Sequence, residues 1–313
     1  MSDKRHKRIH ELIEPLRVPA GKKVHLPKDF DPGYSRKGLT KAQAPELLAE
    51  GIELLAEYQD RLYAADRSSV LLVLQAMDAA GKDGTIKHVM SGVNPQGVDV
   101  HPFKTPTVEE LDHDFLWRCQ KRLPDRGRIG IFNRSYYEET LVVRVHPEFL
   151  ASQRLPADAS KEPGIWKQRF HSINEWEKYL TAQGTKIIKV FLNVSKDEQA
   201  ERFLARIDDP AKNWKFSHND ITERGYWDDY QRAYSEVLSH TSTKYAPWYV
   251  VPADKKWFAR LATAAILIDA LMEIDPQYPV LDDEGKSKLG EAKATLLSEL
   301  PKRARDREKE GKY

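Results

Sequence analysis

The stretch VLLVLQAMDAAGKDGT, residues 70–85, decides the fold of this chain. Its apolar first part, Val70–Leu74, predicts a buried strand of a parallel sheet, and the residues after Gly81 open a helix. Gly81 and Gly84 let the backbone approach an anion closely, while the helix N-terminus directs free N–H groups and partial positive charge toward it. Lys82 would reach the phosphates as a point charge. The stretch therefore predicts a phosphate-binding loop between a strand and a helix.

Two positions of this loop depart from the general pattern G-x-x-x-x-G-K-[ST]. Ala76 stands where the first glycine is expected, and Asp83 stands where a hydroxyl would hold Mg²⁺. Asp78, inside the loop, supplies a carboxylate of its own. We therefore expect a phosphate loop of an unusual kind, with the metal ion resting on loop carboxylates.

The composition is that of a globular chain and gives no global sign of a polyanionic partner. The 313 residues carry 50 basic and 48 acidic side chains, a net charge of +2, and 40% are hydrophobic. The single cysteine, Cys119, cannot form an internal disulfide, which fits a reducing compartment. The basic segment Lys4–Arg8 precedes no signal-type apolar run, and no run approaches the roughly 20 apolar residues of a membrane span. We expect a soluble cytoplasmic protein without a membrane partner.

Strands that alternate with helices predict an α/β fold, a doubly wound parallel sheet with helices on both faces. Residues 1–66 are an N-terminal extension, irregular through Pro19, Pro27 and Pro32, with one packing helix at Thr40–Asp66. Residues 67–275 are the core, and residues 276–313 are a charged tail in which Lys302–Tyr313 is a solvated or frayed helix. The other elements expected are strands at Arg128–Phe132, Ile187–Val194 and Tyr249–Val251, and helices at Thr107–Cys119, Glu162–Thr181, Ser195–Arg206 and Ala259–Glu273.

Polar side chains follow the predicted strand at Arg128–Phe132, the second strand of the core along the chain. In a phosphate-loop enzyme, residues at this place orient Mg²⁺. The first of them is Asn133, which can hydrogen-bond a hydrated metal ion but brings no charge. Asp78 and Glu138 are the carboxylates that could supply it, so we expect them as metal ligands, with Asn133 as a further candidate. Arg134 is positioned to contact transferring phosphate. The four-residue spacing of Arg134 and Glu138 equally fits a structural ion pair.

After Lys82 of the loop and Arg134, a third group of basic residues lies on a helix that leads into a Pro-containing turn. We predict that this helix and turn form a lid around residues 200–220. Arg202 and Arg206 lie four residues apart on one helix face, and Lys212 and Lys215 follow the turn. A lid with arginines excludes water and stabilises spread negative charge in many phosphoryl-transfer enzymes. The two arginines could instead pair with acidic neighbours such as Glu198 as a solvated face. Because loop, polar cluster and basic helix follow successive strands, we expect all three at one edge of the sheet.

Longer motifs in this chain together resemble those of the family-2 polyphosphate kinases. The resemblance runs from about Tyr34 to about Met272, and its motifs are contiguous. They are AMDAAGKDGTIK at residues 76–87, FNRSYYE at 132–138, RFLARIDDPAKNWK at 202–215, WDDY at 227–230 and APWYVVPADK at 246–255.

The resemblance implies a phosphate-loop kinase fold related to thymidylate kinases, with a helical lid. It implies phosphoryl transfer between inorganic polyphosphate and nucleotides, with Mg²⁺ or Mn²⁺. By family analogy Asp78 and Lys82 are catalytic residues of the loop, Arg134 follows the second strand, and the lid arginines bind phosphate. The further candidates for binding phosphate or nucleotide are Ala79, Ala80, Gly81, Asp83, Gly84, Thr85, Lys87, Asn133, Arg144, Lys212 and Lys215.

The residues of the motifs at 76–84 and 132–138 look like those of the subgroup usually called class III. That subgroup is associated with phosphorylating both AMP and ADP. Many family members carry Asp where Asn133 stands and Gly where Ala76 stands. Because Asn133 brings no charge to a metal ion, Glu138 becomes the stronger candidate for a metal-binding carboxylate in this segment. With Asp78 inside it and Asp83 in place of the usual hydroxyl, the loop fits an enzyme whose phosphate donor need not be a nucleotide. The family tends to form dimers or tetramers, so we expect a homodimer or homotetramer.

Our hypothesis is in-line transfer of the terminal phosphoryl group of polyphosphate to AMP or ADP. The alternative enzyme is an ordinary ATP-dependent nucleotide kinase, which would use the same loop for the phosphates of ATP. The phosphate donor, polyphosphate or ATP, distinguishes the two enzymes. A phosphate-loop binding or regulatory protein would keep the loop and transfer nothing. A nucleic-acid-binding role is weaker still, because the basic segment Lys4–Arg8 is short. No motif assigns a residue to the pocket for the nucleotide base.

Overall fold

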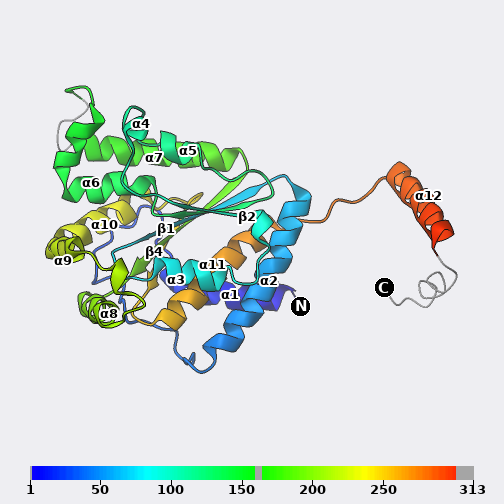
Figure 1. Cartoon of the computed structure of the whole chain (residues 1–313), viewed down its shortest axis with the longest axis horizontal. Coiled ribbons are helices and arrows are strands. Elements are labelled where there is room, and N and C mark those ends of the chain that lie inside the picture. Colours follow the sequence, from blue (N-terminus) through cyan, green and yellow to red (C-terminus); the bar gives the residue numbers. More distant parts are fainter. Residues whose placement is uncertain (1, 159–163, 301–313) are drawn as a thin grey trace. The chain divides into compact units, whose positions relative to one another are not determined.

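A computed structural model describes residues 2–158 and 164–300 (Figure 1). The chain divides into two compact units, Met1–Gln277 and Tyr278–Tyr313. The first unit holds the sheet and its covering helices, and the second holds a single described helix, α12 (Asp283–Glu299). The predicted terminal helix at Lys302–Tyr313 lies outside the described residues.

The first unit is built on five parallel strands in the order β2-β3-β1-β4-β5. The central strand β1 is buried along its whole length, as the apolar run predicts for a strand covered on both faces. Parallel pairing sets Leu74 of β1 beside Asn133 of β3 and Val190 of β4, so the carboxyl ends of these strands meet at one edge. The strand bounds are β1 Ser69–Ala76, β2 Val98–Pro102, β3 Ile129–Asn133, β4 Thr185–Asn193 and β5 Trp248–Pro252.

Helices cover both faces of the sheet, which confirms the doubly wound α/β prediction (Figure 1). On one side lie α1 (Ser2–Ile13), α2 (Ala44–Ala65), α3 (Lys82–Val89) and α11 (Lys256–Ile274), and on the other lie α6 (Val142–Val145), α7 (Gly164–Ala182) and α10 (Trp227–Thr241). The remaining helices are α4 Val108–Leu111, α5 Trp117–Gln120, α8 Lys196–Asp208 and α9 His218–Gly225, with 3₁₀ turns η1 Glu14–Leu16, η2 Pro95–Gly97, η3 Tyr136–Thr140, η4 Pro147–Gln153 and η5 Asn213–Lys215.

The start of the chain is helical, so the prediction of an irregular beginning is wrong for α1. This helix packs on α11 through an apolar stripe that ends in Ile13, which is 1% exposed. His6 adds a hydrogen bond from its Nε2 to Oδ1 of the buried Asp269 at 3.2 Å. The prediction failed because charged residues dominate the segment and its stripe spans few turns. The basic segment Lys4–Arg8 therefore lies in a docked helix and is not a free tail.

The predicted helix at Thr107–Cys119 needs correction, and strand β2 was missed. The helix does begin after Thr107, which forms a capping box with Glu110, its hydroxyl accepting from the Glu110 amide at 3.2 Å. The helix that it opens ends at Leu111, however, and a separate turn of helix, α5, carries Cys119. Strand β2 was not predicted, because this edge strand has no buried residue and lacks an apolar run. The other predicted strands and helices are present with shifted ends.

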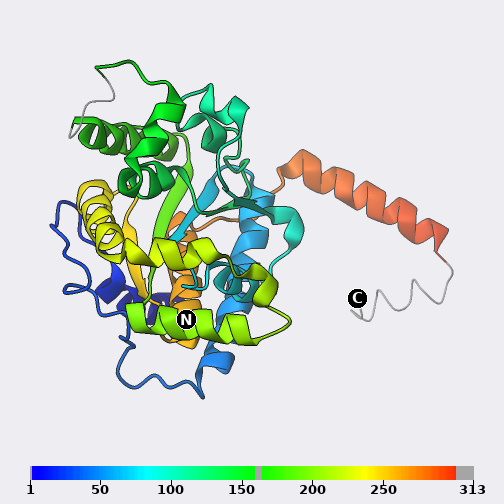
Figure 2. The ribbon, with the colours of Figure 1, turned by 60° about the vertical axis from the view of Figure 1, so that its left-hand side comes forward.

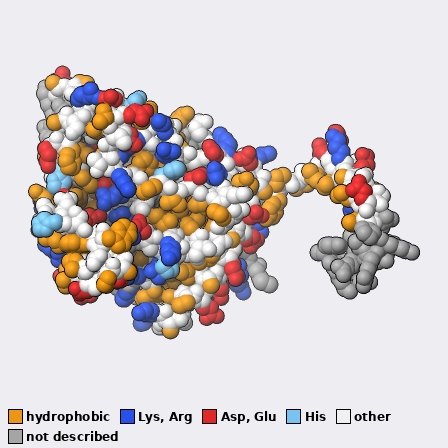
Figure 3. Space-filling model, in the orientation of Figure 1, with side chains coloured by type: hydrophobic (Ala, Val, Ile, Leu, Met, Phe, Trp, Pro, Cys, Tyr) orange, Lys and Arg blue, Asp and Glu red, His pale blue; other side chains and the backbone are white. Residues whose placement is uncertain are grey.

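The second unit exposes apolar and charged side chains together. Leu289 and Leu296 of α12 are 58% and 61% exposed, and charged pairs such as Lys288–Glu284 run along the helix. Figure 3 shows this mixture on the unit's surface. In the described part of the chain, no helix combines the length and the apolar character that crossing a bilayer requires.

Ile13 tests the docking of α1. Replacing Ile13 by Ala removes buried methyl groups and leaves a cavity, so the free energy of unfolding should fall by about 2–5 kcal/mol. Val108→Ala, at a position that is 79% exposed, is the control and should change it little. Urea unfolding measures both, and equal values for the two variants would contradict the docked position of α1.

Candidate active site

The phosphate loop lies where the sequence predicts it, between the end of β1 at Ala76 and the start of α3 at Lys82. Gly81 precedes α3 with φ of 107°, a conformation that favours glycine. Ala79 also takes a positive φ, of 59°, although it carries a Cβ. A non-glycine residue in the left-handed region is an uncommon conformation that clusters at functional sites. The turn thus brings the N-terminus of α3 to the carboxyl edge of β1.

Lys82 points back across this loop. Its Nζ donates to the carbonyl oxygen of Ala76 at 2.9 Å. Burial, reinforced by the nearby charge of Arg134, lowers the pKa of Lys82 to about 8, against the opposing effect of Asp78 and other carboxylates. The ammonium group is therefore poorly solvated in the ligand-free chain, and an arriving phosphate oxygen would be a stronger partner than a carbonyl.

Arg134 joins the loop to the segment after β3. Its Nη2 donates to Oδ1 of Asp78 at 2.8 Å, and its Nη1 donates to Oε2 of Glu138 at 3.0 Å. The residue itself has φ of 65°, which turns the chain sharply as β3 ends. The neighbouring carboxylates, Glu138 first, raise the pKa of Arg134 above its usual value. One guanidinium thus holds two carboxylates from different segments at a single point.

Asp83 and Asn133, the residues at the two positions where phosphate-loop enzymes hold Mg²⁺, contact each other. Nδ2 of Asn133 donates to Oδ1 of Asp83 at 2.8 Å, which ties the end of β3 to α3. In the general pattern position 83 would carry a hydroxyl and position 133 an acidic group. Here both side chains are engaged in one hydrogen bond, while Asp78 and Glu138 converge beside them.

The two lid arginines have different surroundings. Arg202, in α8, is 8% exposed, and its Nε donates to Oε1 of Glu198 at 2.7 Å. Its two Nη atoms donate to four backbone oxygens, those of Ala79, Ala80, Ala253 and Asp254. Arg202 therefore holds the phosphate loop through its backbone carbonyl oxygens. It also pairs with Glu198, as the alternative to a phosphate-binding role predicted.

Arg206 lies one turn further along α8 and is half-buried. Its Nη1 is 3.4 Å from Oδ2 of Asp220 in α9, so the ion pair links the two helices of the lid region. Asp220 lines the same pocket as Asp78 of the loop. Burial raises the pKa of Asp220, and the charge of Asp78 adds to this effect. Figure 2 brings α8 and α9 to the front of the molecule.

The other basic candidates lie apart from this group. Lys212 pairs with Asp209, Lys215 lies 5.1 Å over the ring of Trp214, and Lys87 is exposed on α3. Arg144 of α6 pairs with Glu236 at 2.6 Å and lies 5.6 Å over the Trp166 ring. Thr85 is buried in α3. The structure thus brings together Asp78, Lys82, Asp83, Asn133, Arg134 and Glu138.

A pocket opens beside Arg134, Asp78 and Glu138. The side of the pocket that the sequence did not predict comes from α8, α9 and α10. Gln199 donates from Nε2 to the carbonyl oxygen of Asp78 at 2.9 Å, which fixes the loop from α8. Of the lining residues on this side, only Tyr230 belongs to a motif singled out in the sequence, the WDDY motif at residues 227–230, to which no role was assigned. The lining residues that these three helices contribute are Gln199, Asp220, Glu223, Arg224, Tyr230 and Tyr234.

A parallel sheet with a phosphate loop after β1 and a charged segment after β3 defines the class of phosphate-loop kinase folds. Within this class, the family model of polyphosphate kinase 2 matches residues 39–279. The chain belongs to the polyphosphate kinase 2 family.

Relatives that match most of the chain support this membership. The chain is 50% identical over 285 residues to an ADP-polyphosphate phosphotransferase of Rhodopseudomonas palustris, covering 90% of this chain and 97% of that protein. It is 46% identical over 239 residues to an AMP/ADP-polyphosphate phosphotransferase of Meiothermus ruber, covering 76% and 85%. The crystal structure of polyphosphate kinase 2 from Arthrobacter aurescens TC1 superposes with a TM-score of 0.80 at 43% identity, covering 89% of this chain and 95% of that chain.

The pKa of Lys82 predicts how anion binding depends on pH. As pH rises through about 8, Lys82 of the free protein loses its proton and its attraction for phosphate. Because a bound anion favours the charged form, affinity should fall by up to about tenfold per pH unit above that value. Long-chain polyphosphate is the probe, with its Kd measured by calorimetry. Lys82→Arg keeps its charge and should flatten the slope, and an identical slope in both proteins would contradict this role of Lys82.

Proposed function

We propose that this chain transfers the terminal phosphoryl group of inorganic polyphosphate to AMP and ADP, and catalyses the reverse reaction. The observation that carries the proposal is the convergence of Lys82, Arg134, Asp78 and Glu138 at one sheet edge in a member of the polyphosphate kinase 2 family. The relatives from R. palustris and M. ruber, named for ADP and for AMP/ADP, support the choice of acceptors.

The proposed chemistry is an in-line displacement at the terminal phosphorus of polyphosphate. A terminal phosphate oxygen of the nucleotide forms the new P–O bond, and polyphosphate leaves shortened by one unit. The protein positions the two chains and neutralises their charge, because phosphoryl transfer needs little covalent help. Lys82 and Arg134 supply cations where negative charge gathers, and the N–H groups at the start of α3 bind phosphate oxygens.

The lid region has two proposed roles. Arg206, with Lys212 and Lys215 beyond it, supplies positive charge over the phosphates. Arg202 acts through the loop, since its guanidinium already binds the carbonyl oxygens of Ala79 and Ala80. It keeps the loop in the turned conformation that presents Lys82.

The residues present fit a Mg²⁺ ion, with Mn²⁺ as a substitute. Among the described residues, no three His, Cys, Asp or Glu side chains gather closely enough to form a metal cage. A cage is not required, because Mg²⁺ is usually held by one or two carboxylates together with substrate phosphates. Asp78 and Glu138 would hold it, more than Asn133, whose amide is bonded to Asp83. The ion would neutralise charge on the phosphate oxygens.

We also propose the cytoplasm as the compartment and a homodimer or homotetramer as the assembly. The support for the compartment is the single cysteine, Cys119, which is buried and whose pKa burial raises to about 12. A buried neutral thiol suits a reducing environment and is unlike a reactive nucleophile. The support for the assembly is family membership.

The rival function is an ATP-dependent nucleotide kinase that uses the same loop. The donor separates the two, so the test supplies polyphosphate and ADP without ATP and measures the ATP formed. We expect ATP formation by the wild-type chain. No ATP in this assay, together with phosphorylation of AMP when ATP is supplied, would favour the rival.

Lys82→Met tests the phosphate loop in the same assay. The variant keeps the aliphatic stem but loses the cation, so kcat/KM should fall by about 10²–10³-fold. Lys178→Met, at an exposed position of α7, is the matched control and should retain full activity. Thermal unfolding checks that both variants are folded. A folded Lys82→Met chain with normal turnover would refute the assignment.

The metal ligands are tested through the Mg²⁺ requirement. Asp78→Asn and Glu138→Gln should each raise the Mg²⁺ concentration for half-maximal turnover by about tenfold or more, because each removes a charged oxygen ligand. Asn133→Ala should raise it less. A Mg²⁺ titration of initial rates decides the point, and the largest shift in Asn133→Ala would place the ion at residue 133 instead.

A further inference from the structure

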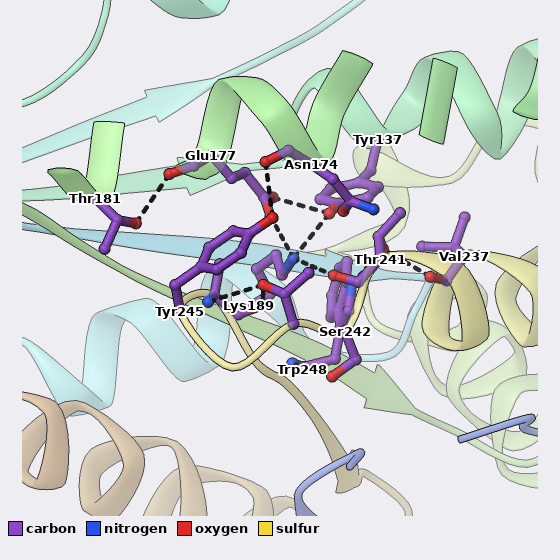
Figure 4. Close-up of polar contacts among 12 residues, drawn as sticks. Tyr137, Asn174, Glu177, Thr181, Lys189, Val237, Thr241, Ser242, Tyr245 and Trp248 are labelled. Carbon is purple, nitrogen blue, oxygen red and sulfur yellow. Dashed lines mark hydrogen bonds and ion pairs between the residues drawn. The ribbon is translucent and has the colours of Figure 1, made fainter. Parts of the chain in front are cut away.

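A fully buried ion pair lies behind the segment that carries Glu138. Nζ of Lys189, in β4, is 2.6 Å from Oε2 of Glu177, in α7, and both side chains have 0% exposure. The other carboxylate oxygen, Oε1, accepts from the hydroxyls of Tyr136 at 2.7 Å and Tyr137 at 2.8 Å. Figure 4 shows Lys189, Glu177 and Tyr137 pointing toward one another. The pair therefore contacts η3 directly.

Every donor of the Lys189 ammonium group has a partner. Besides Glu177, Nζ donates to the Tyr137 hydroxyl at 3.0 Å and to the Thr241 carbonyl oxygen at 2.6 Å. Thr241 ends α10, and its own hydroxyl accepts from Nε1 of Trp248 at 2.9 Å. Burial lowers the pKa of Lys189 against the effect of Glu177. The network is thus satisfied throughout and joins β4, α7, η3 and α10.

Stability alone does not account for such a pair. Moving two charges out of water is costly, and well-packed apolar residues often serve a protein core as well or better. An apolar replacement would fill the same volume but would give two tyrosine hydroxyls no common acceptor. The ion pair instead fixes the position of the first residues of η3, because Glu177 binds the hydroxyls of Tyr136 and Tyr137.

The residues on both sides of Glu138 are anchored from the same helix. Tyr136 and Tyr137 bind Glu177, and on the far side Nη1 of Arg169, also in α7, donates to the Glu139 carbonyl oxygen at 2.7 Å. Glu138 is the residue between them, and its carboxylate faces Arg134 instead. α7 therefore holds the backbone around Glu138 and leaves its side chain to the site.

We propose that Lys189 and Glu177 are positioning residues for phosphoryl transfer, which act through Tyr136 and Tyr137 to set the place of Glu138 and Arg134. The inference rests on the proposed function of that site. It predicts that cutting the link between the ion pair and η3 slows turnover even when the ion pair and the fold are kept.

The variant that cuts this link is Tyr136→Phe with Tyr137→Phe. Both rings stay in the core and Lys189 keeps Glu177, whereas Lys189→Met would strand a buried carboxylate and endanger folding. The matched control is Tyr245→Phe, because its hydroxyl also donates to α7, at the Asn174 carbonyl oxygen at 2.9 Å, but has no link to η3. Figure 4 shows Tyr245 in the same neighbourhood.

Kinetics with polyphosphate and ADP give the first readout. In the double Phe variant kcat should fall by about tenfold or more, with KM for ADP nearly unchanged, as for lost outer partners of a site. Adding Glu138→Gln should then cost less than it does in the wild type, since both changes act through one carboxylate. Turnover equal to that of Tyr245→Phe would overturn the proposal, and so would fully multiplicative effects.

Hydrogen exchange of the backbone over residues 134–141 gives a readout that does not need activity. The double Phe variant should exchange faster there than Tyr245→Phe and the wild type. Unchanged exchange would overturn the positioning role. A wild-type chain that forms no ATP from polyphosphate would contradict the proposed function, while the exchange comparison would still decide whether the ion pair holds η3.

Discussion

The site depends on one guanidinium, that of Arg134. Asp78 follows β1 and Glu138 follows β3, and two carboxylates at such close quarters would repel each other without a cation between them. Arg134 directly follows β3, whose last residue, Asn133, pairs with Leu74, two residues before β1 ends at Ala76. This register brings the loop after β1 within reach of Arg134. The loop and the charged segment therefore meet because of sheet register, and the guanidinium makes that meeting electrostatically favourable.

Buried polar groups hold this centre from two directions. Arg202 of α8 binds the carbonyl oxygens of the phosphate loop, and Glu177 of α7 binds the tyrosines that precede Glu138. Groups held in this way need little reorganisation when charge develops, which is the condition for strong electrostatic stabilisation in a transition state. The exposed lysines of the lid region are less constrained, and they lie outside the pocket lining that the described residues form.

The sequence predicted the parts of the fold that depend on local signals. The apolar run before Gly81 identified β1 and its loop, and the helix starts predicted at Thr107 and Ser195 coincide with the N-cap residues of α4 and α8. Helix α1 was missed because charged residues dominate it and its burial comes from packing on α11. Strand β2 was missed because it is a short edge strand without a buried residue. For the site, four-residue spacing placed Arg202 on a helix face but carried no information on which backbone oxygens would surround it. Likewise, nothing local indicated that α9 would bring Asp220 to the pocket.

The central claim is that polyphosphate and nucleotide meet at the carboxyl edge of β1 and β3. A crystal structure of the chain with ADP and a short polyphosphate tests it most directly. The account predicts phosphate oxygens at the N-terminus of α3, with Lys82 Nζ moved from the Ala76 carbonyl oxygen to the phosphate. A polyphosphate chain bound elsewhere, with Lys82 still bonded to Ala76, would contradict it.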